Sequence, residues 1–490
     1  MSITNVPLYD TLGEESICWT FEQTKLSTIF LSNEGISILL EIKKKGLIDS
    51  LTTLVTFDEI KNEDKELAKK NGVKLMHYDD VVKAGKEESD MKFKPCCGES
   101  ILTICYTSGT TGKAKGVVLT QKNFRDNAVA SMRSGIFHEY KMGYSFLSYL
   151  PLAHVFERIV LYDAIIGVMK MGFYHGVIPE LKDDIQALHP DVFTGVPRIY
   201  CRFYEKIMET INNLGRVKRK LINTAISSKV SNYKKNGTLT HWLYDKAILS
   251  RIRDSFGGNI KMFVSGAAPM DPNIMEKLRV MYSCRFLQGY GQTESAGALS
   301  IAYDNDTYPG SLGPPMACCI AKVVDVPEMG YLSTDEIDGV LTPRGELCFK
   351  GSNLTKEYFK NPEQTEKLYD KDGWMHTGDI GMINSSGCIV IIDRIKNMLK
   401  LQQGEYVALE KLENDLMNSN WISQLFVHGD SYQTYLVGII VPLNNTVMKW
   451  AKENNVKGEF KEVCKSEELN EAILNDLDKL AQEKKVSILI

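Results

Sequence analysis

The fold of this 490-residue chain is decided by Tyr106-Thr-Ser-Gly-Thr-Thr-Gly-Lys-Ala-Lys-Gly-Val117, which follows the apolar run Ile101–Tyr106. That run is typical of a buried strand. The glycines of the loop let backbone N–H groups turn toward one centre, while its hydroxyl side chains and lysines add donors and positive charge. The pattern indicates a polyphosphate site rather than a polar surface turn. It is not a Walker loop, because that pattern needs Gly where Thr107 stands and Ser or Thr where Ala114 stands.

A second motif is Gln288-Gly-Tyr-Gly-Gln-Thr-Glu-Ser295. Its Gly-x-Gly turn is a weak signal, because Glu294 occupies the place of the third dinucleotide-binding glycine. A Tyr between glycines offers a flat ring to a base. A Thr–Glu pair suits a phosphate oxygen and Mg²⁺, which takes one or two carboxylates plus substrate phosphates. Alone, the motif is equally compatible with an ordinary turn.

A third pair of motifs is Gly373-Trp-Met-His-Thr-Gly-Asp-Ile380 and Asp393-Arg-Ile-Lys-Asn-Met-Leu-Lys400. An Asp held after a Gly accepts hydrogen bonds from both hydroxyls of a ribose, and an Arg reaches a ribose or a phosphate. Taken by itself, a turn whose Asp caps the local backbone is the simpler interpretation.

Strand-like and helix-like segments alternate along the chain. Lys261–Val264 and Cys388–Ile392 are predicted strands, and Pro197–Asn212 and Pro272–Met281 are predicted helices. Such alternation favours an α/β fold with largely parallel sheets. The apolar stretch Ile159–Phe173 is too short to cross a bilayer and predicts a buried helix.

The sequence before Asp393 is rich in glycine turns, whereas a compact series of helices and strands is predicted after it. This change predicts a large domain over 1–392 and a small domain over 393–490. The small domain is expected to contain helix Ala408–Met417, strands Ile422–His428 and Tyr435–Pro442, and helices Thr446–Asn454 and Glu467–Lys484.

The composition excludes several classes of protein. The chain has 58 basic and 62 acidic residues, a net charge of −4, and 43% hydrophobic residues, which is typical of a globular protein with no electrostatic preference for nucleic acid. Eleven cysteines, without zinc-type CxxC spacing, favour reduced thiols over disulfides or a structural zinc site. The start of the chain has no signal-peptide pattern.

In their order, the glycine loop, the GYGQTE turn, the TGD and the DRxK resemble the adenylate-forming superfamily of acyl-CoA synthetases, luciferases and peptide-synthetase adenylation domains. Further segments resemble the eukaryotic long-chain fatty acid–CoA ligases in particular. These are Val6-Pro-Leu-Tyr-Asp-Thr-Leu12, Pro151-Leu-Ala-His-Val-Phe-Glu-Arg158, Gly195-Val-Pro-Arg198, Ser265-Gly-Ala-Ala-Pro-Met270 and Lys400-Leu-Gln-Gln-Gly-Glu-Tyr-Val407.

The resemblance implies a fold and a reaction. The fold is a large N-terminal domain of stacked mixed and parallel sheets with helices, followed by a small, mobile α+β domain. The reaction joins a long-chain fatty acid to coenzyme A at the expense of ATP, with Mg²⁺, through an acyl-adenylate. Adenylation with a different acceptor thiol, and a catalytically impaired nucleotide- or acyl-binding paralogue, are the alternatives.

The resemblance also assigns roles to residues of the large domain. The loop Thr107, Ser108, Gly109, Thr110, Thr111, Gly112 and Lys113 would hold the β- and γ-phosphates. Gly266, Ala267 and Ala268 would border the adenine, with Tyr290 between Gly289 and Gly291 stacking on it. Thr293 would contact the α-phosphate, Glu294 would bind Mg²⁺, and His154 would line the acyl and pantetheine side.

Near the domain boundary the resemblance assigns Asp379 and Arg394 to the ribose. Lys396 would be the pivot about which the small domain rotates between half-reactions. Gly404 and Glu405 would lie in the loop that approaches the thiol during thioester formation.

Compared with the family, the chain is expected to lack both ends of a ligase. Val6-Pro-Leu-Tyr-Asp normally lies well inside the large domain, and the family's closing lysine would follow Ile490. The resemblance implies peripheral membrane association through the missing N-terminal region. It implies a location in the cytoplasm or on the cytoplasmic face of intracellular membranes, the endoplasmic reticulum above all.

Overall fold

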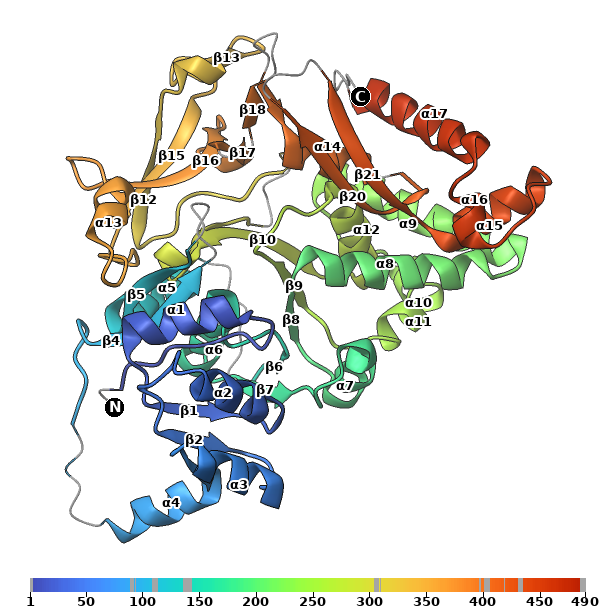
Figure 1. Ribbon diagram of the computed structural model, residues 1–490. Coiled ribbons are helices and arrows are strands. Elements are labelled where there is room, and N and C mark those ends of the chain that lie inside the picture. Colours follow the sequence, from blue (N-terminus) through green and yellow to red (C-terminus); the bar gives the residue numbers. More distant parts are fainter. Residues whose placement is uncertain are drawn as a thin grey trace. The chain divides into compact units, whose positions relative to one another are not determined.

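A computed structural model describes residues 3–88, 92, 94–107, 113–134, 143–303, 308, 310–395, 398–400, 406–417, 419–430 and 435–484. The chain divides into two compact units (Figure 1). The first comprises Met1–Ile320 and Phe349–Met375, and the second comprises Ala321–Cys348 and His376–Ile490. The predicted boundary near Asp393 falls inside the second unit and stays a prediction.

The first unit contains most of the helices. They are α1 (Glu14–Thr24), α2 (Glu34–Lys44), α3 (Asn62–Lys70), α4 (Tyr78–Glu87), α5 (Gln121–Arg133), α6 (Val155–Ile166), α7 (Leu181–Leu188), α8 (Pro197–Asn212), α9 (Arg216–Asn236), α10 (Trp242–Ala247), α11 (Ser250–Asp254), α12 (Pro272–Tyr282) and α13 (Pro362–Leu368), with 3₁₀ turns η1 (Ile178–Glu180) and η2 (Thr293–Ser295).

Its strands form two sheets and a hairpin. They are β1 (Thr28–Leu31), β2 (Thr53–Thr56), β3 (Lys74–His77), β4 (Ile101–Thr107), β5 (Lys115–Thr120), β6 (Ser145–Ser148), β7 (Lys170–Phe173), β8 (Val192–Gly195), β9 (Met262–Ser265), β10 (Arg285–Gln292) and β11 (Gly297–Ile301). The parallel strands β1, β2 and β3 make the smaller sheet, and β4 pairs antiparallel with β5.

The larger sheet has six strands in the order β11-β10-β9-β8-β6-β7, all of which except β11 are labelled in Figure 1. All its neighbours are parallel except β10 and β11. Alternate side chains point to opposite faces, so Phe193 and Phe263 pack with α8, α9 and α12, while Val192 and Met262 pack with α6. With both faces covered, the polar ends of the parallel strands meet at one edge, where ligands bind in open α/β sheets.

A buried tyrosine of α8 forms hydrogen bonds with two strands at this edge. Tyr200 has no exposed surface, and its hydroxyl lies 3.0 Å from the carbonyl oxygen of Phe193 and 2.9 Å from that of Val264. A buried hydroxyl without such partners would cost about 1–3 kcal/mol, so these contacts tie α8 to the ends of β8 and β9.

The prediction of one buried helix over Ile159–Phe173 is wrong. Helix α6 ends at Ile166, Gly167 caps it, and the chain then forms the edge strand β7. Ile165 is 59% exposed and Phe173 is 68% exposed, so the run is not continuously buried. Apolar composition alone does not distinguish a buried helix from a helix followed by an edge strand.

The second unit is formed largely by β-structure followed by helices. Its elements are β12 (Cys319–Val324), η3 (Pro327–Met329), β13 (Glu336–Ile337), β14 (Val340–Leu341), β15 (Arg344–Gly351), β16 (Met375–Ile383), β17 (Ile389–Arg394), β18 (Met398–Lys400), β19 (Tyr406–Ala408), α14 (Leu409–Leu416), β20 (Ile422–Gly429), β21 (Leu436–Pro442), α15 (Asn444–Glu453), α16 (Phe460–Val463) and α17 (Glu467–Lys484). One sheet has the order β12-β15-β16-β17, and three further pairs are β13-β14, β18-β19 and β20-β21.

The mixed α/β fold class is confirmed, as are the individual elements predicted after Asp393, within two residues at each end. Leu412, Val427 and Val447 are buried in one cluster that joins α14, β20 and α15. Among the helices of the described residues, none combines the length and the apolarity needed to cross a membrane.

Candidate active site

The glycine loop connects the two strands of the β4–β5 hairpin. Thr107 pairs directly with Lys115 at the end of the hairpin, so the loop leaves and re-enters adjacent strands. Thr107 and Lys113 are described, whereas the predicted phosphate-binding residues Ser108, Gly109, Thr110, Thr111 and Gly112 lie outside the described residues.

Aromatic side chains contact Lys113, the last residue of the loop, and Lys115, which follows it. Lys113 Nζ lies 4.2 Å from the ring centroid of Trp19, whose indole N–H donates to the carbonyl oxygen of Ala114 at 2.9 Å. Lys115 Nζ lies 5.2 Å from the ring centroid of Tyr358 and donates to Gln364 Oε1 at 2.5 Å. Contacts of this kind attract a cation by about 0.5–2 kcal/mol and restrict where its charge lies.

Tyr358 links the end of the loop to Glu294. Its hydroxyl donates a hydrogen bond to Glu294 Oε1 at 2.8 Å, while its ring faces Lys115. Burial, and then the neighbouring Glu294 carboxylate, raise the pKa of Tyr358, so the phenol keeps its proton and remains a donor. The Lys115 ammonium and the Glu294 carboxylate, which are far apart in the sequence, therefore both contact Tyr358.

The backbone around Glu294 is also fixed. Thr293 and Glu294 form the 3₁₀ turn η2, and the carbonyl oxygen of Glu294 accepts a hydrogen bond from the N–H of Thr355 at 2.7 Å. The half-buried carboxylate has one oxygen oriented by Tyr358. A carboxylate held in this way has the donor chemistry that Mg²⁺ prefers.

Two predicted adenine-site segments begin at the same edge of the larger sheet. Ser265 pairs with Gln288 at the end of the parallel pairing of β9 and β10, so Gly266 directly follows β9 and Gly289 is the next residue of β10. Ala267 adopts a left-handed backbone, with a φ of 69°, which costs a residue with a side chain about 1 kcal/mol or more. Strain of this kind is commonly retained at functional sites.

Tyr290 lies between the two glycines of β10, next to a bulge in the pairing with β11. Its ring centroid is 6.3 Å from that of Phe349. A Cβ added to Gly291 would lie 1.9 Å from the carbonyl oxygen of Gly297, whereas one added to Gly289 would make only ordinary contacts. Gly291 is therefore required by the close approach of β11, independently of any ligand.

His154 caps the N-terminus of α6. Its Nδ1 accepts a hydrogen bond from the N–H of Phe156 at 3.1 Å, and burial lowers the pKa of His154. The ring of Phe156 is 3.2 Å from the place that a Cβ of Gly266 would take. His154 is thus a neutral imidazole on the helix that packs against the predicted adenine-site segment.

In the second unit, Asp379 and Arg394 are directly paired residues of β16 and β17. Arg394 Nε lies 3.3 Å from Asp379 Oδ1, and Asp379 is 3% exposed while the Arg394 side chain is 61% exposed. The two predicted ribose-binding residues therefore lie together. Lys396, Gly404 and Glu405 lie outside the described residues.

The arrangement agrees with a family of known proteins. Residues 1–359 match the family model described as AMP-binding enzyme. The chain belongs to the AMP-binding enzyme family. It is 38% identical to long-chain-fatty-acid–CoA ligase 5 of Mus musculus over 485 residues, which cover 98% of this chain and 69% of the relative.

Other AMP-binding enzymes and their relatives are similar over nearly the whole chain. Peroxisomal long chain acyl-CoA synthetase 7 of Arabidopsis thaliana is 38% identical, with 98% of this chain and 67% of the relative covered. The A domain of a carboxylic acid reductase from Segniliparus rugosus, solved with AMP and a co-purified carboxylic acid, has a TM-score of 0.73 and 25% identity. That comparison covers 99% of this chain and 72% of the solved chain.

Sequence reasoning missed Trp19 and Tyr358 in this AMP-binding enzyme. Both lie far from the glycine loop in the sequence, and an isolated aromatic residue carries no local signal of its partners. Their contacts with Lys113, Lys115 and Glu294 become visible only in the folded chain.

The sequence-based prediction also missed Glu157, a residue with a buried carboxyl group three positions after His154. Glu157 has no exposed surface, and Ser148 Oγ donates to its Oε1 at 2.5 Å. Burial raises the pKa of Glu157 to about 7, so a proton is held there near neutral pH. Its Oε2 has no hydrogen-bond partner among the residues that the structure describes.

Proposed function

We propose that this AMP-binding enzyme is a long-chain fatty acid–CoA ligase. The observation that carries the proposal is the 38% identity to a long-chain-fatty-acid–CoA ligase over 98% of the chain. In the first step the fatty acid carboxylate attacks the α-phosphorus of ATP and pyrophosphate leaves. In the second step the thiol of coenzyme A attacks the acyl carbon of the acyl-adenylate and AMP leaves.

We propose the following roles in the first unit. The loop from Thr107 to Lys113 binds the β- and γ-phosphates, since backbone N–H groups and hydroxyls suit phosphate oxygens. Gly266, Ala267 and Ala268 border the adenine, Tyr290 stacks on it from the Gly289–Gly291 turn, and Thr293 contacts the α-phosphate.

Glu294 would hold Mg²⁺, which supplies neutralisation of phosphate charge when it is bound. Tyr358 orients the Glu294 carboxylate, and the Tyr358 ring keeps Lys115 near the same place. These contacts position charge before the reaction begins, which is the main contribution a protein makes to phosphoryl and adenylyl transfer.

Further residues would serve the ribose and the second step. Asp379 accepts hydrogen bonds from the ribose hydroxyls, and Arg394 supports Asp379 from the neighbouring strand. Lys396 is the proposed pivot of the small domain, Gly404 and Glu405 approach the thiol, and His154 lines the acyl and pantetheine side as a neutral imidazole.

Two assays test the function. Exchange of labelled pyrophosphate into ATP, dependent on a long-chain fatty acid, reports the first step. Formation of acyl-CoA from free coenzyme A reports the second step and separates the ligase from an enzyme that uses another acceptor thiol. Absence of fatty acid-dependent exchange in folded, ATP-binding protein would contradict the proposal.

We further propose that the protein works at the cytoplasmic face of an intracellular membrane, the endoplasmic reticulum in particular. Long-chain fatty acids partition into bilayers, which supports a substrate supply from the membrane surface. Flotation of the natural protein with endoplasmic reticulum vesicles tests this, and recovery only in the unbound fraction would contradict it.

A further inference from the structure

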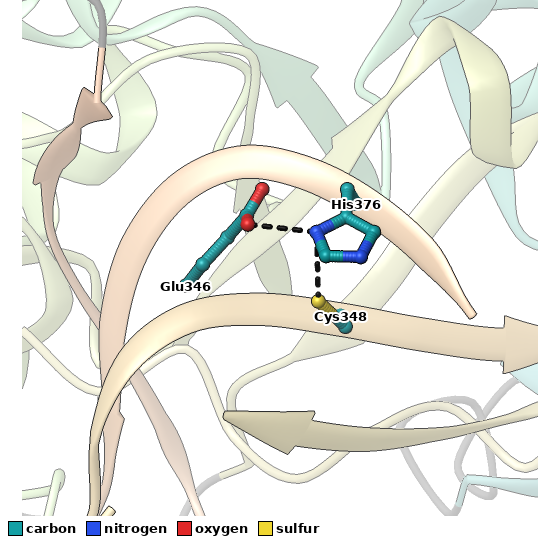
Figure 2. Close-up of side chains that lie close together, drawn as sticks. All are labelled: Glu346, Cys348 and His376. Atoms are coloured by element: carbon teal, nitrogen blue, oxygen red, sulfur yellow. Dashed lines mark hydrogen bonds and ion pairs between the residues drawn. The ribbon is translucent and has the colours of Figure 1, made fainter. Parts of the chain in front are cut away.

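Three side chains with different donor atoms converge in the second unit. Glu346 and Cys348 are two residues apart on β15, so strand alternation places them on the same face of the sheet. His376 lies on β16, the neighbouring strand. Figure 2 shows the imidazole facing both the carboxylate and the sulfur.

The distances are short, and the group is largely shielded from water. His376 Nδ1 lies 2.7 Å from Glu346 Oε2 and 3.5 Å from Cys348 Sγ. All three atoms lie within 4.8 Å of one another. Cys348 has no exposed surface, and the side chains of Glu346 and His376 are 14% and 29% exposed.

One nitrogen faces two atoms that both attract positive charge. A proton on His376 Nδ1 can point at the carboxylate or at the sulfur but not at both, whereas a cation among the three atoms contacts all of them. Tetrahedral Zn²⁺, with bonds of about 2.0–2.3 Å, places nitrogen and sulfur ligands roughly 3.5 Å apart. That separation matches Nδ1 and Sγ, and Glu346 Oε2 needs to withdraw by roughly 0.7 Å to complete the geometry.

The Glu346 carboxylate is also held from outside the group. Its second oxygen, Oε1, accepts a hydrogen bond from the N–H of Gly378 at 3.0 Å, which directs Oε2 toward His376. Supporting hydrogen bonds of this type orient the ligands of metal sites.

We propose that Glu346, Cys348 and His376 form a site for one thiophilic divalent cation, with Zn²⁺ as the occupant. On binding, the Cys348 thiol loses its proton to solvent, and the neutral His376 keeps its proton on Nε2 and coordinates through Nδ1. The carboxylate and the thiolate balance the two charges of the cation. A water molecule completes a four-coordinate site, and no electron is transferred.

Direct metal binding to the full chain tests the site without reliance on ligase turnover. The metal-free protein is titrated with Zn²⁺ by calorimetry and with Co²⁺ by absorption, because a thiolate bound to Co²⁺ gives a charge-transfer band in the near ultraviolet. We expect one equivalent of either cation and a thiolate–cobalt band. Cys348→Ala and His376→Gln should each weaken Zn²⁺ binding by about 100-fold or more and abolish the band.

Cys388→Ala is the matched control, since Cys388 is also a fully buried thiol of the second unit. This variant should retain both the stoichiometry and the band. If Cys348→Ala fails to fold by circular dichroism, His376→Gln decides, because that side chain is partly exposed. Two results would overturn the site: no binding to the unaltered protein, or binding to both ligand variants that is as tight as to the unaltered protein, which would indicate an adventitious ion only.

Discussion

Tyr358 carries two interactions of opposite charge, one with the Lys115 ammonium through its ring and one with the Glu294 carboxylate through its hydroxyl. Without the ring, Lys115 would keep its charge and its hydrogen bond to Gln364 but lose its aromatic contact. Without the hydroxyl, Glu294 Oε1 would lose the donor that orients it. At the scale of single residues, the candidate site depends on orientation as much as on charge.

Changing Glu294 to Gln should lower the rate of fatty acid adenylation by about 100-fold, because Gln keeps the shape but loses the charge that would bind Mg²⁺. Tyr358→Phe should produce a smaller loss, seen mainly in the KM for Mg·ATP. The double variant should lose less than the product of the two single effects, since both changes act on one hydrogen bond.

Steady-state kinetics of ATP–pyrophosphate exchange across a Mg²⁺ series measure these effects. Glu357→Gln serves as the control, because Glu357 is an exposed carboxylate next to Tyr358 in the sequence, and this variant should leave the rate unchanged. Unaltered kinetics of Glu294→Gln in a folded protein would remove Glu294 from the metal site.

At the scale of elements, the two glycines of the GYG turn beside the β10–β11 bulge differ in the space that each has for a side chain. Gly291→Ala should destabilise the protein by at least about 2 kcal/mol, because its Cβ would meet the carbonyl oxygen of Gly297 at 1.9 Å. Gly289→Ala should cost less than about 1 kcal/mol, since its nearest contact is 3.5 Å. Urea unfolding of the two variants compares them, and equal destabilisation would contradict the requirement at Gly291.

Glu157 in α6 predicts a dependence of stability on pH. The burial of Glu157 raises its pKa from 4.5 to about 7 in the folded chain. Between these values the folded state binds a proton that the unfolded state has lost, so stability falls as pH rises from 4.5 to 7 and is then constant. The difference corresponds to about 3 kcal/mol.

Glu157→Gln should therefore be more stable relative to the unaltered protein at pH 8 than at pH 5. Gln keeps an oxygen that accepts from Ser148 and has no charge to bury. Denaturant unfolding at both pH values gives the comparison, in which the contributions of other titrating groups cancel. A stability difference that does not change with pH would show that Glu157 titrates normally.

Much of the fold could be predicted from the sequence, because helices α8 and α17 and strand β4 are marked by local periodicity, and Pro197 marks the start of α8. The prediction for Ile159–Phe173 was wrong because an apolar run does not indicate which of its side chains are exposed to solvent in the fold. Local motifs likewise drew attention to Asp379 and Arg394, which pair directly on β16 and β17, while their role at the ribose stays a prediction.

The supports of the site could not be predicted, because they depend on contacts between segments distant in the sequence. Trp19 reaches the loop lysine Lys113 across the fold, and Tyr358 reaches Glu294. The Glu346, Cys348 and His376 group contains no zinc-type spacing, since its members come from alternation along β15 and from pairing with β16.

At the scale of the whole molecule, the two half-reactions are expected to require different arrangements of the small domain about Lys396. Lys396→Pro should impair acyl-CoA formation at least about tenfold more than ATP–pyrophosphate exchange, because Pro fixes φ at the proposed pivot. Single-turnover assays of each half-reaction separate the effects, with Lys371→Pro, in a surface turn of the first unit, as a control for a nonspecific proline effect. Equal loss in both steps would count against the pivot.

Pyrophosphate exchange into ATP by the purified chain, with and without a long-chain fatty acid, measures the proposed first step itself. A long-chain fatty acid–CoA ligase should show exchange that needs both the fatty acid and Mg²⁺ and that Glu294→Gln nearly abolishes. Protein that is folded and binds ATP, yet gives the same exchange with and without the fatty acid, would contradict this function.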